Sequence, residues 1–183
     1  MKGDIIVELK NVTKHFGSVT AVENISMQVR AGEVLCLLGD NGAGKSTLIK
    51  TLYGACHPER GEFLFKGRPV PIASPAEARR LGIAVIFQEF SLVPYLDLAQ
   101  NIFLGREIRG RVAWTIDHAR MHAEARRLLI SLGLDLDTRT LAHQLGVAQQ
   151  QMVEIAKALS QDARILVMDE PSAALSDREI ERL

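Results

Sequence analysis

A glycine-rich loop between an apolar run and a helical pattern constrains the fold of this chain more than any other feature. The loop comprises Gly39, Asp40, Asn41, Gly42, Ala43, Gly44, Lys45, Ser46 and Thr47, and fits the spacing G-x-x-x-x-G-K-S/T. The apolar run at residues 34–38 predicts a strand buried on both faces of a parallel sheet. A helix is predicted from Lys45 to about Tyr53. A strand, a glycine loop and a helix in this order predict an α/β fold with a phosphate-binding loop.

The residue types in the loop suit a nucleoside triphosphate with Mg²⁺. Glycines let successive backbone N–H groups converge on phosphate oxygens, and the following helix adds its positive N-terminal end. Lys45 supplies a point charge for the β and γ phosphates, and the Ser46 hydroxyl can ligate Mg²⁺. The alternative interpretation is a glycine-rich turn whose lysine has no role. Motif and context together favour the phosphate loop.

A second chemical signal follows the apolar residues 165–168, where the chain continues with Asp169 and Glu170. This order predicts Asp169 at the carboxyl end of a buried strand, where open α/β sheets bind ligands. Asp169 would hold Mg²⁺, directly or through water, and Glu170 would polarise an attacking water. The alternative is a strand end followed by a polar turn, because acids often follow strands. The phosphate loop favours the chemical interpretation.

The 183 residues correspond to one domain with an insert. Strand signals are absent from residues 89–160, where Met121, Ala125 and Leu129 recur at helical spacing and Gly133 ends that helix. We expect a core with a β subdomain at 1–88 and 161–183, and a helical insert at 89–160. The other short strands are predicted at residues 5–9, 25–29, 61–67 and 83–87.

Composition excludes several classes of protein. The 22 basic and 22 acidic side chains balance, which excludes a strongly basic nucleic-acid wrapper. No run approaches the roughly 18 apolar residues that span a bilayer. The two cysteines, Cys36 and Cys56, do not form a disulfide scaffold and indicate a reducing, cytosolic compartment. Cys36 lies in the apolar run and is predicted to be a small core residue.

These features together resemble the ABC-type ATPases, from about residue 5 to the end of the chain. The phosphate loop, Gln88 after a strand, the helical insert and Asp169-Glu170 occur in that family's order. Residues 145–159 correspond to its signature region, which begins here with Leu145, Gly146, Val147, Ala148 and Gln149. This stretch is most similar to the degenerate signature of the ATP-binding subunits of bacterial simple-sugar importers, of the ribose, galactose and xylose type. Those subunits carry two ATPase halves, so the resemblance implies that this chain is most of the first half, truncated at its C-terminal side.

The resemblance implies an α/β P-loop NTPase fold of ABC type, with a mixed sheet core, a small antiparallel β subdomain and a helical insert. Phe16 corresponds to the aromatic residue that stacks on adenine, although an ordinary core phenylalanine is the alternative. Gln88 corresponds to the glutamine that reaches Mg²⁺ or the lytic water. With Lys45 and Glu170 it completes the implied catalytic set. The signature implies binding to the γ-phosphate of ATP held by the opposite half.

The implied function is Mg·ATP hydrolysis coupled to sugar import. The implied partners are a second ATPase half, membrane permease subunits and, indirectly, a periplasmic sugar-binding protein, with no nucleic acid. The implied location is peripheral, at the cytoplasmic face of the inner membrane. Residues 92–96 would form a docking surface for the permease or else local core. Two alternatives are a soluble ABC ATPase acting on ribosomes or DNA, and a non-catalytic ATP-binding regulatory half.

Two departures from the family pattern bear on activity. Gly146 stands where the common signature has serine, so one side-chain donor to phosphate is missing. No histidine follows Glu170, so the fragment itself is expected to be impaired in hydrolysis. Elsewhere, His118 and His122 have the spacing of two metal ligands on one helix face, but no third ligand is evident and a solvated face is favoured.

Overall fold

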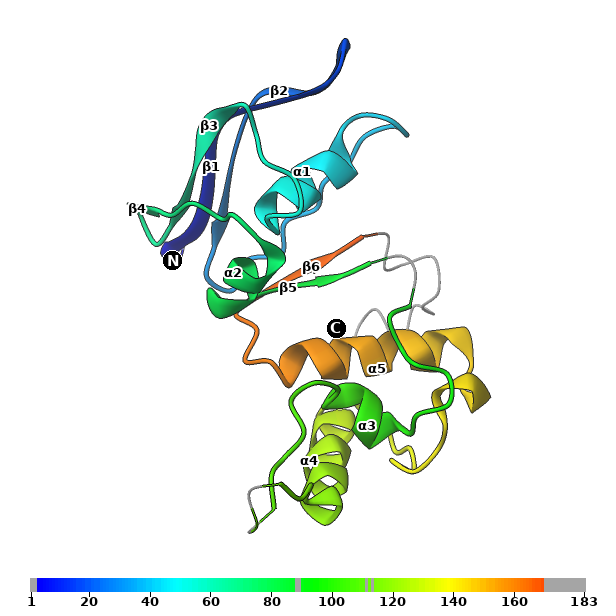
Figure 1. Ribbon diagram of the computed structural model, residues 1–183. Coiled ribbons are helices and arrows are strands. Elements are labelled where there is room, and N and C mark those ends of the chain that lie inside the picture. The colour runs from blue at the N-terminus through cyan, green and yellow to red at the C-terminus, as the bar shows by residue number, and fades with distance from the viewer. Residues whose placement is uncertain (1–2, 88–89, 111, 113, 170–183) are drawn as a thin grey trace. The chain divides into compact units, whose positions relative to one another are not determined.

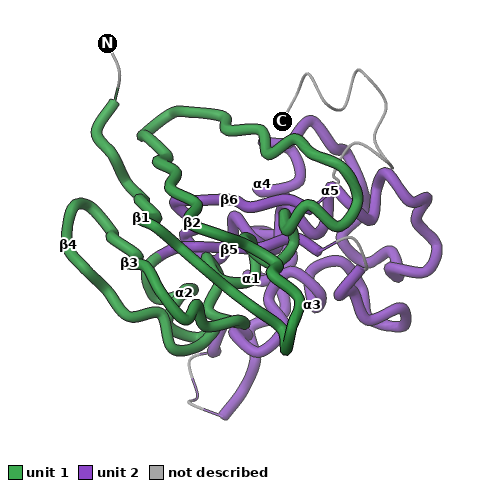
Figure 2. The backbone as a smooth tube through the Cα atoms, turned by 90° about the horizontal axis from the view of Figure 1, so that it is seen from above, with its two compact units in different colours: residues 1–81 green, residues 82–183 purple. Residues whose placement is uncertain are grey.

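The computed structural model describes residues 3–87, 90–110, 112 and 114–169. The chain divides into two compact units, Met1–Leu81 and Gly82–Leu183, which are coloured separately in Figure 2. Each unit is described by itself. The predicted division into a core at 1–88 with 161–183 and an insert at 89–160 stays a prediction.

The first unit is built on an antiparallel sheet with the strand order β2-β1-β3-β4 (Figure 1). The strands are β1 (Ile5–Phe16), β2 (Val19–Arg30), β3 (Arg60–Phe65) and β4 (Arg68–Pro69). The buried side chains of β1 are those of Val7, Leu9 and Val12, each at most 1% exposed. An irregularity in the pairing between Leu9 and Val12 changes the alternation there. This sheet confirms the predicted antiparallel β subdomain.

Both β1 and β2 are 12 residues long, more than twice the predicted length. Their pairing passes through irregularities, and Asn11 and Asn24 each adopt a left-handed φ of 51°. Asparagine tolerates this conformation, so a bulge can absorb the irregularity without ending the strand. Ser26 supports the bulge, because its hydroxyl accepts from the Asn11 N–H at 2.9 Å. The polar residues therefore interrupt the sequence pattern but not the sheet.

Two helices complete the first unit. The helix α1 (Lys45–Leu52) buries Leu48, Ile49 and Leu52, and confirms the helix predicted after the glycine loop. The helix α2 (Pro75–Arg80) begins after Ser74, whose hydroxyl accepts from the Glu77 N–H at 3.3 Å. A proline at the first helical position fits because its missing N–H has no partner there in any case.

The second unit combines a parallel strand pair with helices. The strands β5 (Ile83–Ile86) and β6 (Ile165–Met168) pair in register, and α5 (Val147–Leu159) runs alongside them (Figure 1). Met152 and Ile155 of α5 pack with Ala84 and Ile86. The remaining elements are α3 (Leu98–Ile102), α4 (His118–Ser131) and the short 3₁₀ helix η1 (Ala142–Gln144). The helical stretch between two strands is thus confirmed.

Residues 34–38 differ from the prediction of a buried strand. They form no strand, and the side chains of Val34 and Leu38 are 93% and 91% exposed. No strand in the described part of the chain pairs with this run, so its backbone joins no sheet there. The prediction that Cys36 is a core residue is also wrong, since Cys36 is exposed and Cys56 is the buried cysteine. An apolar run states a preference for burial but does not supply the strands that would bury it.

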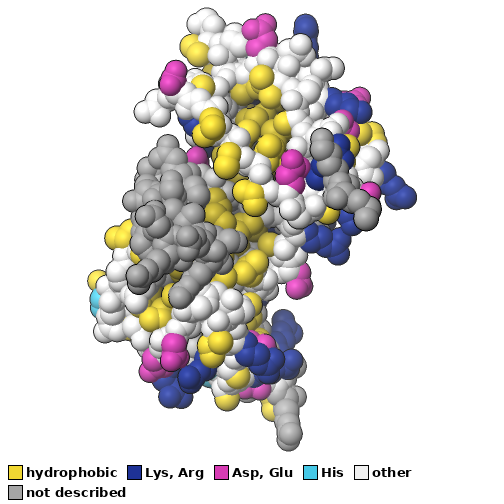
Figure 3. All heavy atoms as spheres, turned by 180° about the vertical axis from the view of Figure 1, so that it is seen from behind, with side chains coloured by type: hydrophobic (Ala, Val, Ile, Leu, Met, Phe, Trp, Pro, Cys, Tyr) yellow, Lys and Arg dark blue, Asp and Glu magenta, His cyan; other side chains and the backbone are white. Residues whose placement is uncertain are grey.

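The surface carries charges of both signs. Figure 3 shows Lys and Arg side chains interspersed with Asp and Glu on the face that it draws. None of the helices that the structure describes combines the length and apolar character that a membrane-spanning segment needs.

Candidate functional site

The predicted phosphate loop leads into α1 through Gly44. Gly44 is the N-cap of the helix with a left-handed φ of 85° and ψ of 4°, and no side chain caps the helix at this end. The first N–H groups of a helix have no intrahelical partner, and they carry the positive end of the helix dipole. No acidic residue lies in the first turn to neutralise that charge. The start of α1 therefore offers backbone donors to an anion.

Glycine is required at position 44 because the loop touches β2 there. A Cβ atom built on Gly44 would collide with the carbonyl oxygen of Ala21 and would lie 3.1 Å from Cγ2 of Val22. The close approach of the two backbones anchors the loop on β2. The spacing motif names this glycine, but only the structure shows which strand it contacts.

Phe16 lies at the same end of the β1–β2 hairpin as this contact. It ends β1 and pairs with Val19, which is two residues from Ala21 along β2, a span of about 7 Å. Its side chain is 54% exposed, so the alternative interpretation as a core phenylalanine is wrong. The structure thus brings an exposed aromatic ring and the glycine loop to one end of one hairpin.

The Lys45 ammonium lies against the backbone of the loop that precedes it. Its Nζ donates to the carbonyl oxygens of Gly39 at 2.6 Å and of Asp40 at 2.9 Å. Both acceptors are neutral carbonyls, whereas a phosphate carries a full negative charge that attracts the ammonium directly. A phosphate at the loop would therefore compete well for this ammonium. The neighbouring Ser46 is exposed in the first turn of α1, as are the loop residues Asn41, Gly42 and Ala43.

The other predicted catalytic residues belong to the second unit or fall outside the described residues. Asp169 follows β6, and its N–H donates to the carbonyl of Ile86 at 3.1 Å, which continues the parallel ladder. Its position at the carboxyl end of β6 is the predicted one. Gln88 and Glu170 lie outside the described residues. The structure therefore brings Phe16, Lys45 and Ser46 into one unit and Asp169 into the other.

The predicted signature forms the start of α5. Leu145 is 8% exposed, and Gly146 is the N-cap of the helix, with an extended backbone at φ −67° and ψ 160°. The Gly146 N–H donates to Oε1 of Gln149 at 3.2 Å, while Val147 is 56% exposed. Glycine has no side chain with which to cap the helix. The first turn of α5, which includes Ala148, therefore keeps its N–H groups free of side-chain capping.

Side-chain capping distinguishes α1 and α5 from the other described α-helices. Ser74, Asp97 and Asp117 cap α2, α3 and α4, and each accepts a hydrogen bond from the backbone N–H three residues later. The starts of α1 and α5 have no such acceptor. The phosphate loop predicts phosphate at the start of α1, and the family resemblance implies it at the start of α5.

One polar cluster on α5 was not predicted from the sequence. Glu154 is 7% exposed, and its two carboxylate oxygens accept from the Ser91 N–H at 2.5 Å and the Ser91 hydroxyl at 3.0 Å. Lys157 adds a hydrogen bond to the same hydroxyl at 3.0 Å. A carboxylate between the apolar residues Val153 and Ile155 was the available signal. Its effect is to tie α5 to the segment that follows Gln88.

The predicted docking segment at residues 92–96 proves to be mixed. Leu92 is 8% exposed and belongs to the core, whereas Val93 and Tyr95 are 37% and 80% exposed. The Tyr95 ring lies 5.5 Å from the ring of His143, centroid to centroid. Leu92 is therefore core, whereas docking through the exposed Val93 and Tyr95 stays a prediction.

The two histidines of α4 differ in their surroundings, since His118 is exposed and His122 is half-buried. Nδ1 of His122 lies 2.9 Å from Oγ1 of Thr138, and its Nε2 lies 3.9 Å from Oδ2 of Asp97. Within the described ranges, no group of three or more His, Cys, Asp or Glu side chains gathers as metal ligands would.

Comparison with known proteins identifies the family of the chain. The family model described as "ABC transporter" matches residues 22–173. The chain is 53% identical over 178 residues to ribose import ATP-binding protein RbsA 1 of Rubrobacter xylanophilus. It is 50% identical to ribose import ATP-binding protein RbsA 1 of Streptomyces coelicolor. Each match covers 97% of this chain and 35% of the relative, so the chain spans about a third of these relatives' length.

Solved structures agree with the sequence comparison. An ATP-binding cassette of an ABC transporter superposes with a TM-score of 0.84 at 28% identity, over 97% of this chain and 73% of that chain. A dimeric cassette in a post-hydrolysis state, bound to ADP and Pi, gives a TM-score of 0.78 at 28% identity over 97% and 79%. These folds match the predicted α/β cassette with its antiparallel sheet and helical region. The chain belongs to the ABC transporter family.

Proposed function

We propose that this chain binds Mg·ATP, in a protein that couples ATP hydrolysis to the import of ribose or a related sugar through a membrane permease. The observation that carries the proposal is the Lys45 ammonium held by neutral carbonyls at the uncapped start of α1. The names of the similar proteins supply the sugar. The family supplies the coupling to transport.

In this proposal the loop residues 39–47 hold the phosphates through backbone N–H groups. Lys45 leaves the carbonyls of Gly39 and Asp40 and donates to the β and γ phosphates, where it stabilises charge that develops during phosphoryl transfer. Phe16 stacks on the adenine base, which its exposure and its place beside the Gly44 contact support.

Mg²⁺ would be held by the hydroxyl of Ser46, by Asp169 and by Gln88. These are oxygen ligands, the type that Mg²⁺ prefers. When bound, Mg²⁺ neutralises charge on the phosphate oxygens. Glu170 orients the attacking water and accepts its proton. The exposure of Ser46 at the first turn of α1 and the placement of Asp169 at the end of β6 support this set.

A second ATPase half would complete the site from the signature side. The uncapped first turn of α5, from Gly146 onward, would donate to the γ-phosphate of ATP held by that half. Glycine contributes no hydroxyl there, so this contact is expected to be weaker than in cassettes with serine. The exposed Tyr95 would face a permease subunit at the cytoplasmic side of the inner membrane. A periplasmic sugar-binding protein would act through the permease.

Two variants of the full-length protein test the chemistry. Lys45→Ala should weaken ATP binding, because the loop loses its only predicted charge for the phosphates. Glu170→Gln should retain binding and stop turnover at this site. Equal turnover at this site by wild type and Glu170→Gln would contradict the assignment. Co-purification with ribosomes or DNA in place of membranes would contradict the transport role.

A further inference from the structure

The carboxylate of Glu59 gathers donors from the last residues of β1. Its Oε1 accepts from the Lys14 ammonium and from the His15 N–H, each at 3.3 Å. Its Oε2 lies 2.5 Å from Nδ1 of His15. The Glu59 N–H donates to the carbonyl of Thr13 at 2.9 Å. One residue thus holds three consecutive positions of β1.

Glu59 lies directly before β3, where the pairing between β1 and β3 stops. The last β1–β3 pair joins Thr13 to Arg60, so no β3 residue lies opposite the end of β1. The Glu59 side chain accepts the hydrogen bond from the His15 N–H, which a backbone carbonyl of a neighbouring strand would accept in a longer sheet. Because β2 pairs with the same residues of β1 on the other side, Glu59 supplies the partner on the β3 side alone.

Lys14 links this carboxylate to the aromatic ring of Phe16. Its Nζ lies 5.3 Å from the centroid of the Phe16 ring, within the range of a cation–π contact. The Lys14 side chain is only 18% exposed, although it lies near the turn of the β1–β2 hairpin. Glu59 therefore fixes a cation over the ring that ends β1.

We propose that Glu59 is a positioning residue for base binding: by holding Lys14 and His15, it fixes the Phe16 ring in the orientation that stacks on the base of a bound nucleotide. The inference rests on the proposed ATP-binding function and deepens it. An aromatic ring that is ordered before binding loses less conformational entropy when the base arrives.

The charge state of Glu59 supports this role. The hydrogen bond from the His15 side chain, followed by those from the His15 backbone and from Lys14, lowers the pKa of Glu59 below its ordinary value. The carboxylate is therefore ionised at neutral pH and can accept all three hydrogen bonds.

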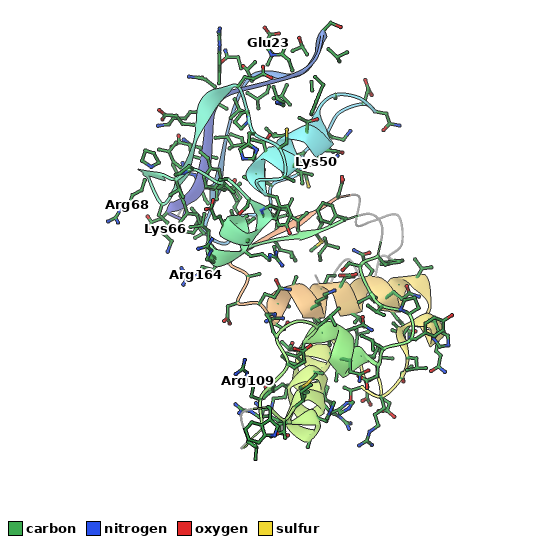
Figure 4. All side chains as sticks on the ribbon, in the orientation of Figure 1. Glu23, Lys50, Lys66, Arg68, Arg109 and Arg164 are labelled. Atoms are coloured by element: carbon green, nitrogen blue, oxygen red, sulfur yellow. The ribbon has the colours of Figure 1, made fainter. Side chains whose placement is uncertain are left out.

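The test compares two ligands that differ in having a base. ATP and inorganic tripolyphosphate, each with Mg²⁺, are titrated into the chain and into the variants Glu59→Gln and Phe16→Ala. Glu23→Gln is the matched control, an exposed carboxylate of β2 that Figure 4 labels. Glu59→Gln should weaken ATP binding about two- to fivefold, the range for an exposed charged cluster, and leave tripolyphosphate binding unchanged. Glu23→Gln should change neither.

A second comparison separates positioning from general damage. Phe16→Ala should weaken ATP binding roughly 5- to 150-fold, and adding Glu59→Gln to it should cause no further loss. Loss of tripolyphosphate binding in Glu59→Gln, or additive losses in the double variant, would overturn the proposal. If Phe16→Ala weakens ATP binding and Glu59→Gln does not, the inference fails while the proposed function stands. If Lys45→Ala and Phe16→Ala both leave ATP binding unchanged, the proposed function itself fails.

Discussion

Two glycines of the phosphate loop have nearly the same φ angle but different surroundings. Their φ angles are 87° at Gly42 and 85° at Gly44. A Cβ atom at Gly42 would meet nothing within 4 Å, whereas one at Gly44 would collide with the Ala21 carbonyl. Substitution at Gly42 therefore measures the free-energy cost of a side chain in the left-handed region alone. Substitution at Gly44 adds the cost of the collision with β2.

We predict that Gly44→Ala destabilises the chain more than Gly42→Ala. Alanine in the left-handed region costs about 1–2 kcal/mol at either site. The collision at Gly44 should add about 1–3 kcal/mol, the range for overpacking. Urea unfolding of the two variants gives the comparison. Equal losses would show that the contact between the loop and β2 does not exist in solution.

The ionisation of Glu59 predicts an acid-sensitive contribution to stability. Its pKa in the folded chain lies below the ordinary 4.5, so the folded state binds this proton less readily than the unfolded state. The stabilisation is therefore fully present above pH 4.5 and is lost as pH falls through the lowered pKa. The stability advantage of wild type over Glu59→Gln, followed by thermal unfolding, should shrink on acidification below that point. An advantage that is constant with pH would contradict the contact.

Asn101 shows how one buried amide can order a loop. It is fully buried, its Oδ1 accepts from the Val93 N–H at 2.7 Å, and its Nδ2 donates to the carbonyls of Val93, Leu96 and Asp97 at 3.1–3.2 Å. All of these partners lie in the segment that leads into α3. The loop that presents Tyr95 is therefore held from within the unit.

Replacing Asn101 by Asp should be costly despite the similar shape. The carboxylate keeps an acceptor for Val93 but loses the donors and faces carbonyl oxygens. We expect a loss of about 2–4 kcal/mol in free energy of unfolding, from buried groups left unpaired. Glu124→Gln on α4, which breaks only a surface pair with Arg127, should stay within about 0.5 kcal/mol. Similar small effects of both would contradict the buried network.

At the scale of elements, α5 combines two features. Its first turn is free of side-chain capping, and its middle carries the Glu154 carboxylate that binds Ser91. The helix therefore joins the signature to the segment that follows Gln88 in the sequence. A movement of α5 would therefore move the segment around Ser91 through this contact.

Glu154→Ala should destabilise the second unit by about 1.5–3 kcal/mol, because two Ser91 donors lose the charged acceptor that the buried Glu154 supplies. Lys157→Met removes only a donor to the Ser91 hydroxyl, leaves the Glu154 carboxylate in place, and should cost less than about 1 kcal/mol. Chemical unfolding followed by circular dichroism measures both. A larger loss for Lys157→Met than for Glu154→Ala would reverse the assigned order.

Most elements could be predicted from local patterns, and the exceptions have identifiable causes. Residues 165–168 became β6 because a short apolar run found β5 as its partner. Residues 34–38 have the same kind of pattern, yet no described strand pairs with them. The lengths of β1 and β2 were missed because Asn11 and Asn24 form bulges where the pattern predicts strand ends.

At the scale of the whole molecule, the sequence predicts candidate site residues but not the contacts that position them. Lys45 and Gly146 follow from motifs whose spacing is local. The contacts of Glu59 with His15 and of Ser91 with Glu154 join residues 44 and 63 positions apart, and no local spacing encodes such pairs. The proximity of Phe16 to the glycine loop likewise depends on the register of the hairpin.

The most direct test of the account is the melting temperature of this chain with and without Mg·ATP, measured for wild type and Lys45→Ala. Ligand at about 100 times its dissociation constant adds about 2.7 kcal/mol of stability. For a chain of this size that is a rise of roughly 5–11 °C. We predict this rise for wild type and its loss in Lys45→Ala. An equal rise in both proteins, or none in either, would contradict the claim that the loop at the start of α1 binds the nucleotide.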